Sequence, residues 1–348
     1  MPFEANWLPT TIGSMPHTSA DEACKAVMRA TPDIPAWPQL PRRALEENMY
    51  AQYMDMFPGV EVRDGKVCVT LDEAFRSDLE RLYLDYVEGN VGKYLVGPSW
   101  AAGLNTMLEM LESGQRELVA IKGQVIGPVS LALQVTDQDL RPLLYDEIVF
   151  DAVSKYLRLV AQAQERLLRR VSSTTIIFFD EPYLNAFGSA LFSVSREQIA
   201  TGLEEVFGGV AGLKGVHCCG NTDWSVVLST SLDVLSFDAY HYAETLALYP
   251  EDVKAFLERG GILAWGIVPA EEQLLAKENA SSLFERLMEG VQLLIGKGVP
   301  RDILVVQSLV TPSCGLGSVS VSAAERALEL LAQVSAEARS QLLYVRGR

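Results

Sequence analysis

The chain has 348 residues, of which 49% are hydrophobic, and its formal net charge at pH 7 is −16. That length suits one large α/β barrel or two ordinary domains, and the hydrophobic content excludes a disordered chain. The acidic balance argues against binding to nucleic acid, because a phosphate backbone requires a basic protein surface. It argues equally against binding to an anionic membrane surface.

Cysteine usage and the N-terminus bear on the compartment. The five cysteines lack the density and spacing of a disulfide framework. The start of the chain, Met1-Pro2-Phe3-Glu4, has no basic region followed by an apolar core, so we expect no signal peptide. No apolar run approaches the ~20 residues of a membrane span. We therefore expect a soluble protein in the reducing cytoplasm.

Short apolar segments alternate with longer segments of helical periodicity, a pattern typical of parallel βαβ units. We predict eight strands, at 10–14, 34–38, 119–125, 174–179, 215–219, 233–238, 262–268 and 303–309. Helices are predicted at 19–30, 103–114, 143–171, 196–208, 222–231, 250–259, 270–298 and 321–339. This order favours a (β/α)8 TIM barrel, formed by a single domain over residues 1–348. A doubly wound open sheet is the alternative, although no Gly-x-Gly-x-x-Gly follows the first strand.

An insertion interrupts this pattern after the second predicted strand. Residues 60–70 alternate in polarity around Asp64-Gly65, a pair typical of tight hairpin turns. We predict a β-hairpin there and a helix near 71–89. An insertion at this point lies at the C-terminal face of a barrel, where it is either a lid over the site or a surface ornament.

A His-x-Cys pair at the end of the fifth predicted strand is the strongest chemical signal. Strand side chains alternate between two faces, so His217 and Cys219 point the same way while Cys218 points away. Cys314 follows the eighth predicted strand, which ends at the same rim of a barrel. Three such ligands with an open fourth position are typical of a catalytic zinc site. The alternative is that these cysteines are small buried hydrophobes.

Other polar residues gather at the predicted strand ends. Asp238 is a fourth zinc ligand, a support for His217, or a cap of the next segment. Asp180 ends the fourth strand and is placed to receive a substrate ammonium group, with a salt bridge as the alternative. Gly13-Ser14 ends the first strand, where a hydroxyl and nearby amides are available for a carboxylate.

Five segments together resemble the catalytic barrel of cobalamin-independent methionine synthase. They are TTIGSMPHT, FFDEP, VHCCGN, DVLSFD and PSCGL, and they lie in the same order between residues 10 and 316. VHCCGN and IPAWPQLPRR also resemble the wider superfamily that contains uroporphyrinogen decarboxylase and the methylcobalamin:coenzyme M methyltransferases. The resemblance implies a (β/α)8 barrel whose zinc activates the thiol of homocysteine.

The resemblance also assigns roles to individual residues of this chain. The implied zinc ligands are His217, Cys219, Cys314 and, where the family has a glutamate, Asp238. The implied substrate contacts are Ile12, Gly13 and Ser14 for the amino-acid carboxylate and Asp180 for the amino group. The implied reaction moves a methyl group to homocysteine and forms methionine, with a methyl-corrinoid or methyltetrahydrofolate as donor.

Two departures concern the methyl-donor half of that site. Gln134 follows Gly127-Pro128-Val129-Ser130 where the family has a tryptophan that stacks on folate, and 265–269 lacks the family's catalytic histidine. No catalytic acid is assigned, and a corrinoid protein is favoured over methyltetrahydrofolate as donor. Two rival functions remain. One is a uroporphyrinogen decarboxylase-like enzyme, with Arg42-Arg43 beginning a cationic pocket, and the other is a non-catalytic barrel that binds zinc and a corrinoid partner.

Overall fold

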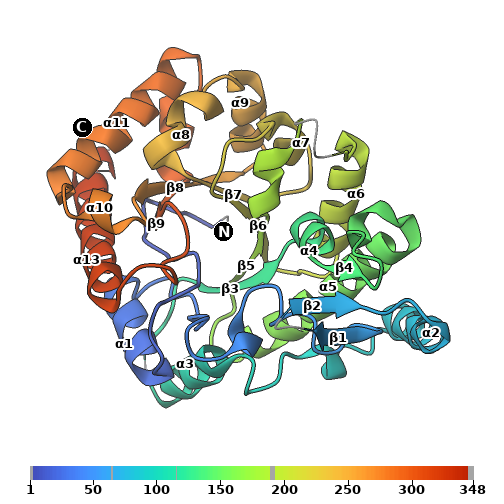
Figure 1. Cartoon of the computed structure of the whole chain (residues 1–348). Coiled ribbons are helices and arrows are strands. Elements are labelled where there is room, and N and C mark those ends of the chain that lie inside the picture. Colours follow the sequence, from blue (N-terminus) through green and yellow to red (C-terminus); the bar gives the residue numbers. More distant parts are fainter. Residues whose placement is uncertain (1–2, 64–65, 115, 189–192, 344–348) are drawn as a thin grey trace.

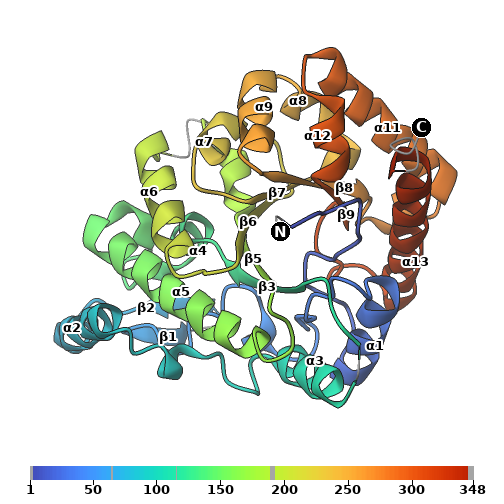
Figure 2. The same ribbon diagram turned by 180° about the vertical axis from the view of Figure 1, so that it is seen from behind.

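The structure is a computed structural model that describes residues 3–63, 66–114, 116–188 and 193–343. Six parallel strands form one curled sheet, with helices around its outside (Figures 1 and 2). In sheet order these strands are β3 (Ile121–Ile126), β5 (Thr175–Asp180), β6 (Leu213–Cys218), β7 (Val234–Phe237), β8 (Ile262–Val268) and β9 (Ser308–Pro312). The fold is therefore mixed α/β, with the sheet forming a half-barrel.

The α-helices of the described residues lie before, between and after these strands along the chain. They are α1 (Ala20–Ala30), α2 (Glu73–Glu88), α3 (Ala102–Ser113), α4 (Pro128–Gln134), α5 (Glu147–Leu168), α6 (Arg196–Phe207), α7 (Trp224–Leu228), α8 (Ala239–Leu246), α9 (Pro250–Glu258), α10 (Glu272–Leu275), α11 (Ala280–Gly296), α12 (Arg301–Val306) and α13 (Val321–Ala338). None of these helices is both long enough and apolar enough to cross a membrane. Helices α4 and α8 were not predicted.

The two faces of the sheet pack into two separate apolar clusters. On β5, Ile176 and Phe178 belong to a small inner cluster, while Ile177 and Phe179 belong to the large cluster between sheet and helices. This division follows from the two-residue period of a strand. It places every second residue of β5 and β6 inside the curl, and these inner positions lead to the rim where the strands end.

Two extended segments lie along the edges of the sheet where we predicted the first two strands. The segments 10–14 and 34–38 form no continuous strands. Isolated parallel bridges instead pair Pro9 with Val310, Ser14 with Gln39, and Ala36 with Lys122. Proline has no backbone N–H to donate, so Pro35 and Pro38 limit the ladder in the segment 34–38.

The predicted strand at 303–309 is wrong. Residues Arg301–Val306 form helix α12, and the strand that follows is β9 (Ser308–Pro312). Pro300 stands at the N-cap of α12 and starts the helix. A short, continuously apolar run fits a buried helix as well as a buried strand, and here periodicity does not separate them. The predicted helix at 270–298 is divided into α10 and α11.

The predicted insertion contains the hairpin and the helix. Strand β1 (Val60–Arg63) pairs antiparallel with β2 (Lys66–Val69), and α2 follows. The predicted turn at Asp64-Gly65 lies outside the described residues. Strand β2 also pairs with the two-residue β4 (Thr136–Asp137), which comes directly after α4. The hairpin therefore adjoins the segment that follows the C-terminal end of β3.

Candidate metal and substrate site

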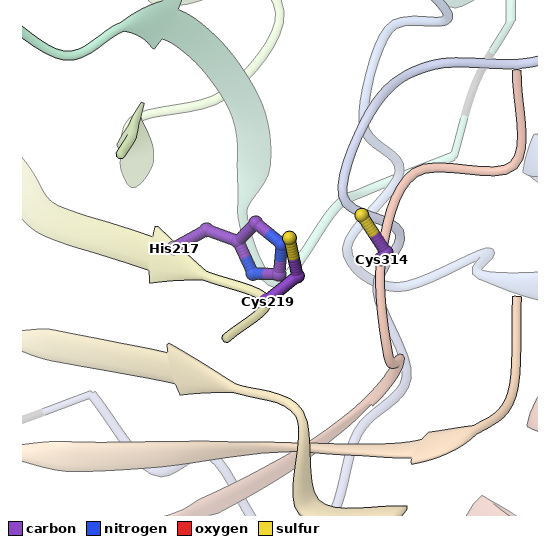
Figure 3. A group of neighbouring side chains, drawn as sticks. All are labelled: His217, Cys219 and Cys314. Carbon is purple, nitrogen blue, oxygen red and sulfur yellow. The ribbon is translucent and has the colours of Figure 1, made fainter. Parts of the chain in front are cut away.

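Three potential metal ligands converge at the rim of the sheet. The ligand atoms of His217, Cys219 and Cys314 all lie within 4.8 Å of one another. His217 is on β6, Cys219 follows that strand directly, and Cys314 is on the loop after β9 (Figure 3). Two residues 95 positions apart from each other, Cys219 and Cys314, are thus brought together by the curl of the sheet.

The imidazole of His217 is oriented by a neighbouring strand. Its Nδ1 lies 3.0 Å from the hydroxyl oxygen of Ser236 on β7, and its Nε2 is buried without a hydrogen-bond partner among the described residues. A histidine that ligates a metal usually uses its other ring nitrogen for such an orienting contact. An Nδ1–H that donates to Ser236 leaves the Nε2 lone pair free to bind a cation.

The two thiols lie close enough to shift each other's pKa. The neighbouring Cys314 thiol, followed by the His217 imidazole, outweighs burial and lowers the pKa of Cys219 to about 4. The neighbouring Cys219 thiol, together with burial, raises the pKa of Cys314. Cys219 is therefore the more acidic of the two thiols. Cys218, by contrast, faces the helix layer, and burial raises its pKa to about 12.

Asp238 lies outside this group of ligand atoms. It is the N-cap of α8, where one carboxylate oxygen accepts a hydrogen bond from the backbone N–H of His241 at 3.0 Å. Its other carboxylate oxygen lies 2.8 Å from Nδ1 of the same histidine. Among the three roles that the sequence left open for Asp238, these contacts correspond to the cap.

A cavity of about 340 Å³ opens beside the three ligands. Its lining includes Ile12, Ser14, Gln39, Asp180, His217 and Cys314. Of the predicted substrate contacts, Ile12, Ser14 and Asp180 therefore line the same space as the three converging ligands, whereas Gly13 is not among the lining residues. A cavity of this size accommodates a small-molecule ligand.

Ser14 is hydrogen-bonded directly to the loop that contains Cys314. The backbone oxygen of Ser14 accepts a hydrogen bond from Leu316 at 2.8 Å. A Cβ added to Gly315 would lie 2.1 Å from the Ser14 hydroxyl oxygen, so this approach requires glycine. Gly13 has a φ of +146° and sits against the Gln124 side chain, which also favours glycine there.

Asp180 and Glu181 are adjacent in sequence and have different environments. One carboxylate oxygen of Asp180, Oδ1, is buried without a hydrogen-bond partner among the described residues. Burial raises the pKa of Asp180 to about 6, against the opposing charges of His217 and Lys122. Glu181 instead accepts hydrogen bonds from the backbone N–H groups of Val129 and Ser130, at the start of α4. Glu181 therefore supports the fold, and Asp180 faces the cavity.

Three residues at this site were missed in the sequence: Ser236, Gln39 and Lys122. The Gln39 amide nitrogen donates to Gln52 at 2.7 Å and to Tyr53 at 3.1 Å, which fixes the side-chain orientation. Lys122 is completely buried on β3. A signal existed for Lys122, because a charged residue within an otherwise apolar strand is rarely buried without a role.

The two arginines considered for a cationic pocket are bound to the protein itself. The guanidinium of Arg42 donates to the backbone oxygens of Gly317 and Ser318 at 3.1 and 2.7 Å. Arg43 forms an ion pair of 2.6 Å with the buried Glu47. Both therefore hold the loops of the rim together.

A second cavity, of about 680 Å³, lies between the hairpin and α4. Tyr50, Lys66, Cys68 and Gln134 contribute to its lining, and Asn48 lines both this cavity and the one beside the ligands. The Tyr183 hydroxyl donates to the side-chain oxygen of Gln134. The predicted insertion thus forms one wall of a second cavity next to the ligand group.

Comparison with known proteins identifies the fold. No protein-family model and no curated protein sequence matches the chain. A solved B12-independent methionine synthase from Shewanella sp. W3-18-1, in complex with selenomethionine, is similar at 14% identity with a TM-score of 0.62, over 97% of this chain and 99% of that one. A methyltransferase from Methanosarcina mazei is similar at 13% identity with a TM-score of 0.56, over 94% and 87% of the two chains. At such identities, the likeness shows a shared fold.

Proposed function

We propose that this chain is a zinc-dependent S-methyltransferase that moves a methyl group to the thiol of homocysteine and forms methionine. The observation that carries the proposal is the convergence of His217, Cys219 and Cys314 at one rim of the sheet. The two similar solved structures, a methionine synthase and a methyltransferase, support the same class of reaction. The five sequence segments that resemble methionine synthase support the choice of homocysteine.

We further propose that the whole chain is one (β/α)8 barrel. The segments at 10–14 and 34–38 occupy the places of the first two strands, because their parallel bridges lead from β9 through both segments to β3. Backbone hydrogen bonds reinforce these bridges, with Thr10 donating to Val310 and Lys122 donating to Pro35. Such a closed arrangement would collect the C-terminal ends of all eight segments around the cavity.

The donor set at the rim fits a zinc ion. Zinc prefers imidazole and thiolate ligands, and the three residues supply one imidazole nitrogen and two sulfurs. The unpartnered, buried Nε2 of His217 is otherwise costly to leave without a hydrogen bond. A zinc ion bound there would hold an incoming thiol in its deprotonated form.

The cavity walls supply the contacts for the amino-acid end of the substrate. Asp180 would bind the ammonium group with its unpartnered Oδ1, and Ser14 with the Ile12-Gly13 backbone would bind the carboxylate. With both groups held, the substrate sulfur points to the metal ligands. The sulfur then forms a bond to the methyl carbon as the bond between that carbon and the donor breaks, and the electron pair leaves with the donor.

The donor is proposed to be a methyl-corrinoid carried by a partner protein. Gln134 is where the resembled family has its folate-stacking tryptophan, and it lines the cavity beside the hairpin with an amide in place of an aromatic ring. We propose that the hairpin of the insertion, which forms a wall of that cavity, covers the donor when it is bound. Methyltetrahydrofolate is the alternative donor.

Three measurements test the proposal. The purified protein is analysed for metal and then assayed for methyl transfer from methylcobalamin and from methyltetrahydrofolate, with homocysteine and coenzyme M as acceptors. We expect stoichiometric zinc and methylation of homocysteine. X-ray absorption at the zinc edge should show one new sulfur contact after homocysteine is added. A zinc-loaded protein that gains no sulfur contact with any thiol would contradict this function.

A further inference from the structure

A lysine lies inside the curled sheet, among residues that are otherwise apolar. Lys122 on β3 pairs with Ile176 of the inner cluster on β5, and its side chain has no exposed surface. Its Nζ lies 4.2 Å from the centre of the Phe178 ring. Barrel interiors are usually filled by branched apolar side chains. Removing an ammonium group from water costs several kcal/mol, so a lysine at this position needs a compensating role.

The contacts of Lys122 lead directly to the proposed carboxylate site. Its Nζ donates a hydrogen bond to the backbone oxygen of Ile12 at 2.7 Å and to the side-chain oxygen of Gln124 at 3.2 Å. The Gln124 amide in turn donates to the backbone oxygen of Trp37 at 2.9 Å. The ammonium group therefore holds the segment Ile12–Ser14 in place from below, on the side away from the cavity.

A charged residue of the cavity, Asp180, also interacts electrostatically with Lys122. Burial lowers the pKa of Lys122 to about 7, and the one charge that opposes this change is that of Asp180. Asp180 lines the cavity, whereas Lys122 is hydrogen-bonded to Ile12 and is not among the described residues that line the cavity.

We infer that Lys122 is a positioning residue that makes the cavity selective for a thiol carrying both an ammonium and a carboxylate group. This inference rests on the proposed function. One positive charge lies behind the segment expected to bind the carboxylate, and one negative charge faces the position expected for the ammonium. A zwitterionic amino-acid thiol matches both, whereas a thiol with only one of the two charges leaves a buried charge uncompensated.

The test compares ligands that carry both charges or only one of them. Dissociation constants of the zinc-loaded protein are measured by calorimetry for homocysteine, for homocysteine methyl ester and for 4-mercaptobutyrate. The ester lacks the carboxylate charge, and 4-mercaptobutyrate lacks the ammonium group. Wild-type protein should bind homocysteine most tightly. In the variant Lys122→Met, binding of homocysteine and 4-mercaptobutyrate should weaken at least tenfold, whereas binding of the ester, which Lys122 affects only through Asp180, should weaken less than either.

Three further variants separate charge from structure. Lys122→Arg keeps the positive charge and should retain the wild-type order of affinities. Lys122→Gln removes the charge but keeps a hydrogen-bond donor, so it gives the deciding result if Lys122→Met does not fold. The matched control is Lys214→Met, because Lys214 lies near the opposite end of the sheet on β6, with its Nζ 3.5 Å from Asp233. That control should keep the wild-type preference.

The outcomes distinguish this inference from the proposed function. Equal weakening of all three ligands in the neutral variants would show that Lys122 only supports the fold, and would overturn the inference. Unchanged preferences in a variant that still methylates homocysteine would overturn it as well, while leaving the proposed function intact. Wild-type protein that holds zinc but binds none of the three thiols would overturn the proposed function itself.

Discussion

Two carboxylates stand at the two ends of β5 and have opposite environments. Glu165, near the beginning of the strand, accepts hydrogen bonds from Thr175, Ala211 and Gly212 and an ion pair from Arg169. Asp180, the last residue of the strand, leaves Oδ1 buried and unpartnered among the described residues. The first carboxylate has its partners within the protein, and the second lacks them.

The same difference holds across the sheet. At the C-terminal rim, Nε2 of His217 is buried without a partner among the described residues, whereas Asp233, near the opposite end, accepts a hydrogen bond from the backbone N–H of Lys214. Protein interiors rarely leave buried polar atoms unpaired without a reason. We infer that residues near the beginnings of the strands mainly stabilise the fold, whereas residues at the rim have unpartnered polar atoms that are available to a ligand. Substitutions at the two ends should therefore have separable effects.

The largest expected effect is on metal binding at the rim. Cys314→Ser replaces a thiolate with a hydroxyl, which is a poor zinc ligand. Zinc affinity should fall by more than about 100-fold, since losing even an orienting partner costs about 10–100-fold. Competition with a chromogenic chelator measures this change. Cys68→Ser, on β2 and half exposed, is the control and should retain zinc. Retention of stoichiometric zinc by Cys314→Ser would contradict the proposed site.

At the other end of the strands, Glu165→Gln should reduce stability and leave the site intact. Burial alone would raise the pKa of Glu165, but hydrogen bonds from Thr175, Ala211 and Gly212 outweigh it and lower the pKa. We expect a loss of about 1.5–3 kcal/mol in the free energy of unfolding at neutral pH, measured by urea titration. The exposed Glu329→Gln should change it by about 0.5 kcal/mol or less.

The pH dependence of this stability has a defined sign. A lowered pKa in the folded state means that the ionised carboxylate stabilises the protein above the pKa of an unfolded glutamate, about 4.3. That stabilisation is lost as pH falls through the lower, folded-state pKa. The difference in unfolding free energy between wild type and Glu165→Gln should therefore shrink on acidification. A difference that grows toward acid pH would show that the carboxylate is not ionised in the folded protein.

A smaller effect is expected from Ser236→Ala at the rim. The substitution removes the partner that orients the His217 ring, so zinc affinity should fall by about 10–100-fold. The measurement is again chelator competition. Ser335→Ala is matched in chemistry, since its hydroxyl binds the backbone oxygen of Trp7 instead, and it should leave zinc affinity unchanged. An equal loss of affinity in both variants would indicate a general effect on folding.

The helices and strands were predictable from the sequence where their pattern of apolar residues was uninterrupted. The helices α5 and α13 lie close to their predicted positions because their apolar residues keep a helical period, and the strands β5 and β8 do so because β-branched and aromatic residues fill short apolar runs. The segments at 10–14 and 34–38 have strand-like composition, but they pair only through isolated bridges to neighbours distant in sequence, and the two prolines of 34–38 remove ladder donors. The run before β9 was ambiguous because it is apolar on every side.

The candidate metal ligands were predictable as far as the alternation of side chains between the two faces of a strand determines them. This alternation places His217 and Cys219 on the same face, and the position of Cys314 after a strand that ends at the same rim adds the third ligand, without any knowledge of contacts. The contact between His217 and Ser236 joins two strands, and their register cannot be read from either strand alone. The Asp238–His241 contact is different. Both residues lie within one helical turn, so the cap was readable as a local pattern.

The smallest expected effect concerns the unpartnered polar atoms near the rim, and it tests whether each of them binds a ligand. The hydroxyl of Thr311 on β9 is buried without a partner, yet Thr311 is not among the described residues that line the ligand cavity. Thr311→Val keeps the shape and removes the hydroxyl, so the free energy of unfolding should rise by about 1 kcal/mol while homocysteine affinity stays the same. Thr311→Ser keeps the hydroxyl and loses a methyl group, which should cost about 0.8 kcal/mol. If Thr311→Val instead weakened homocysteine binding, the hydroxyl would belong with Asp180 and His217, and the ligand site would extend along β9 toward the interior of the sheet.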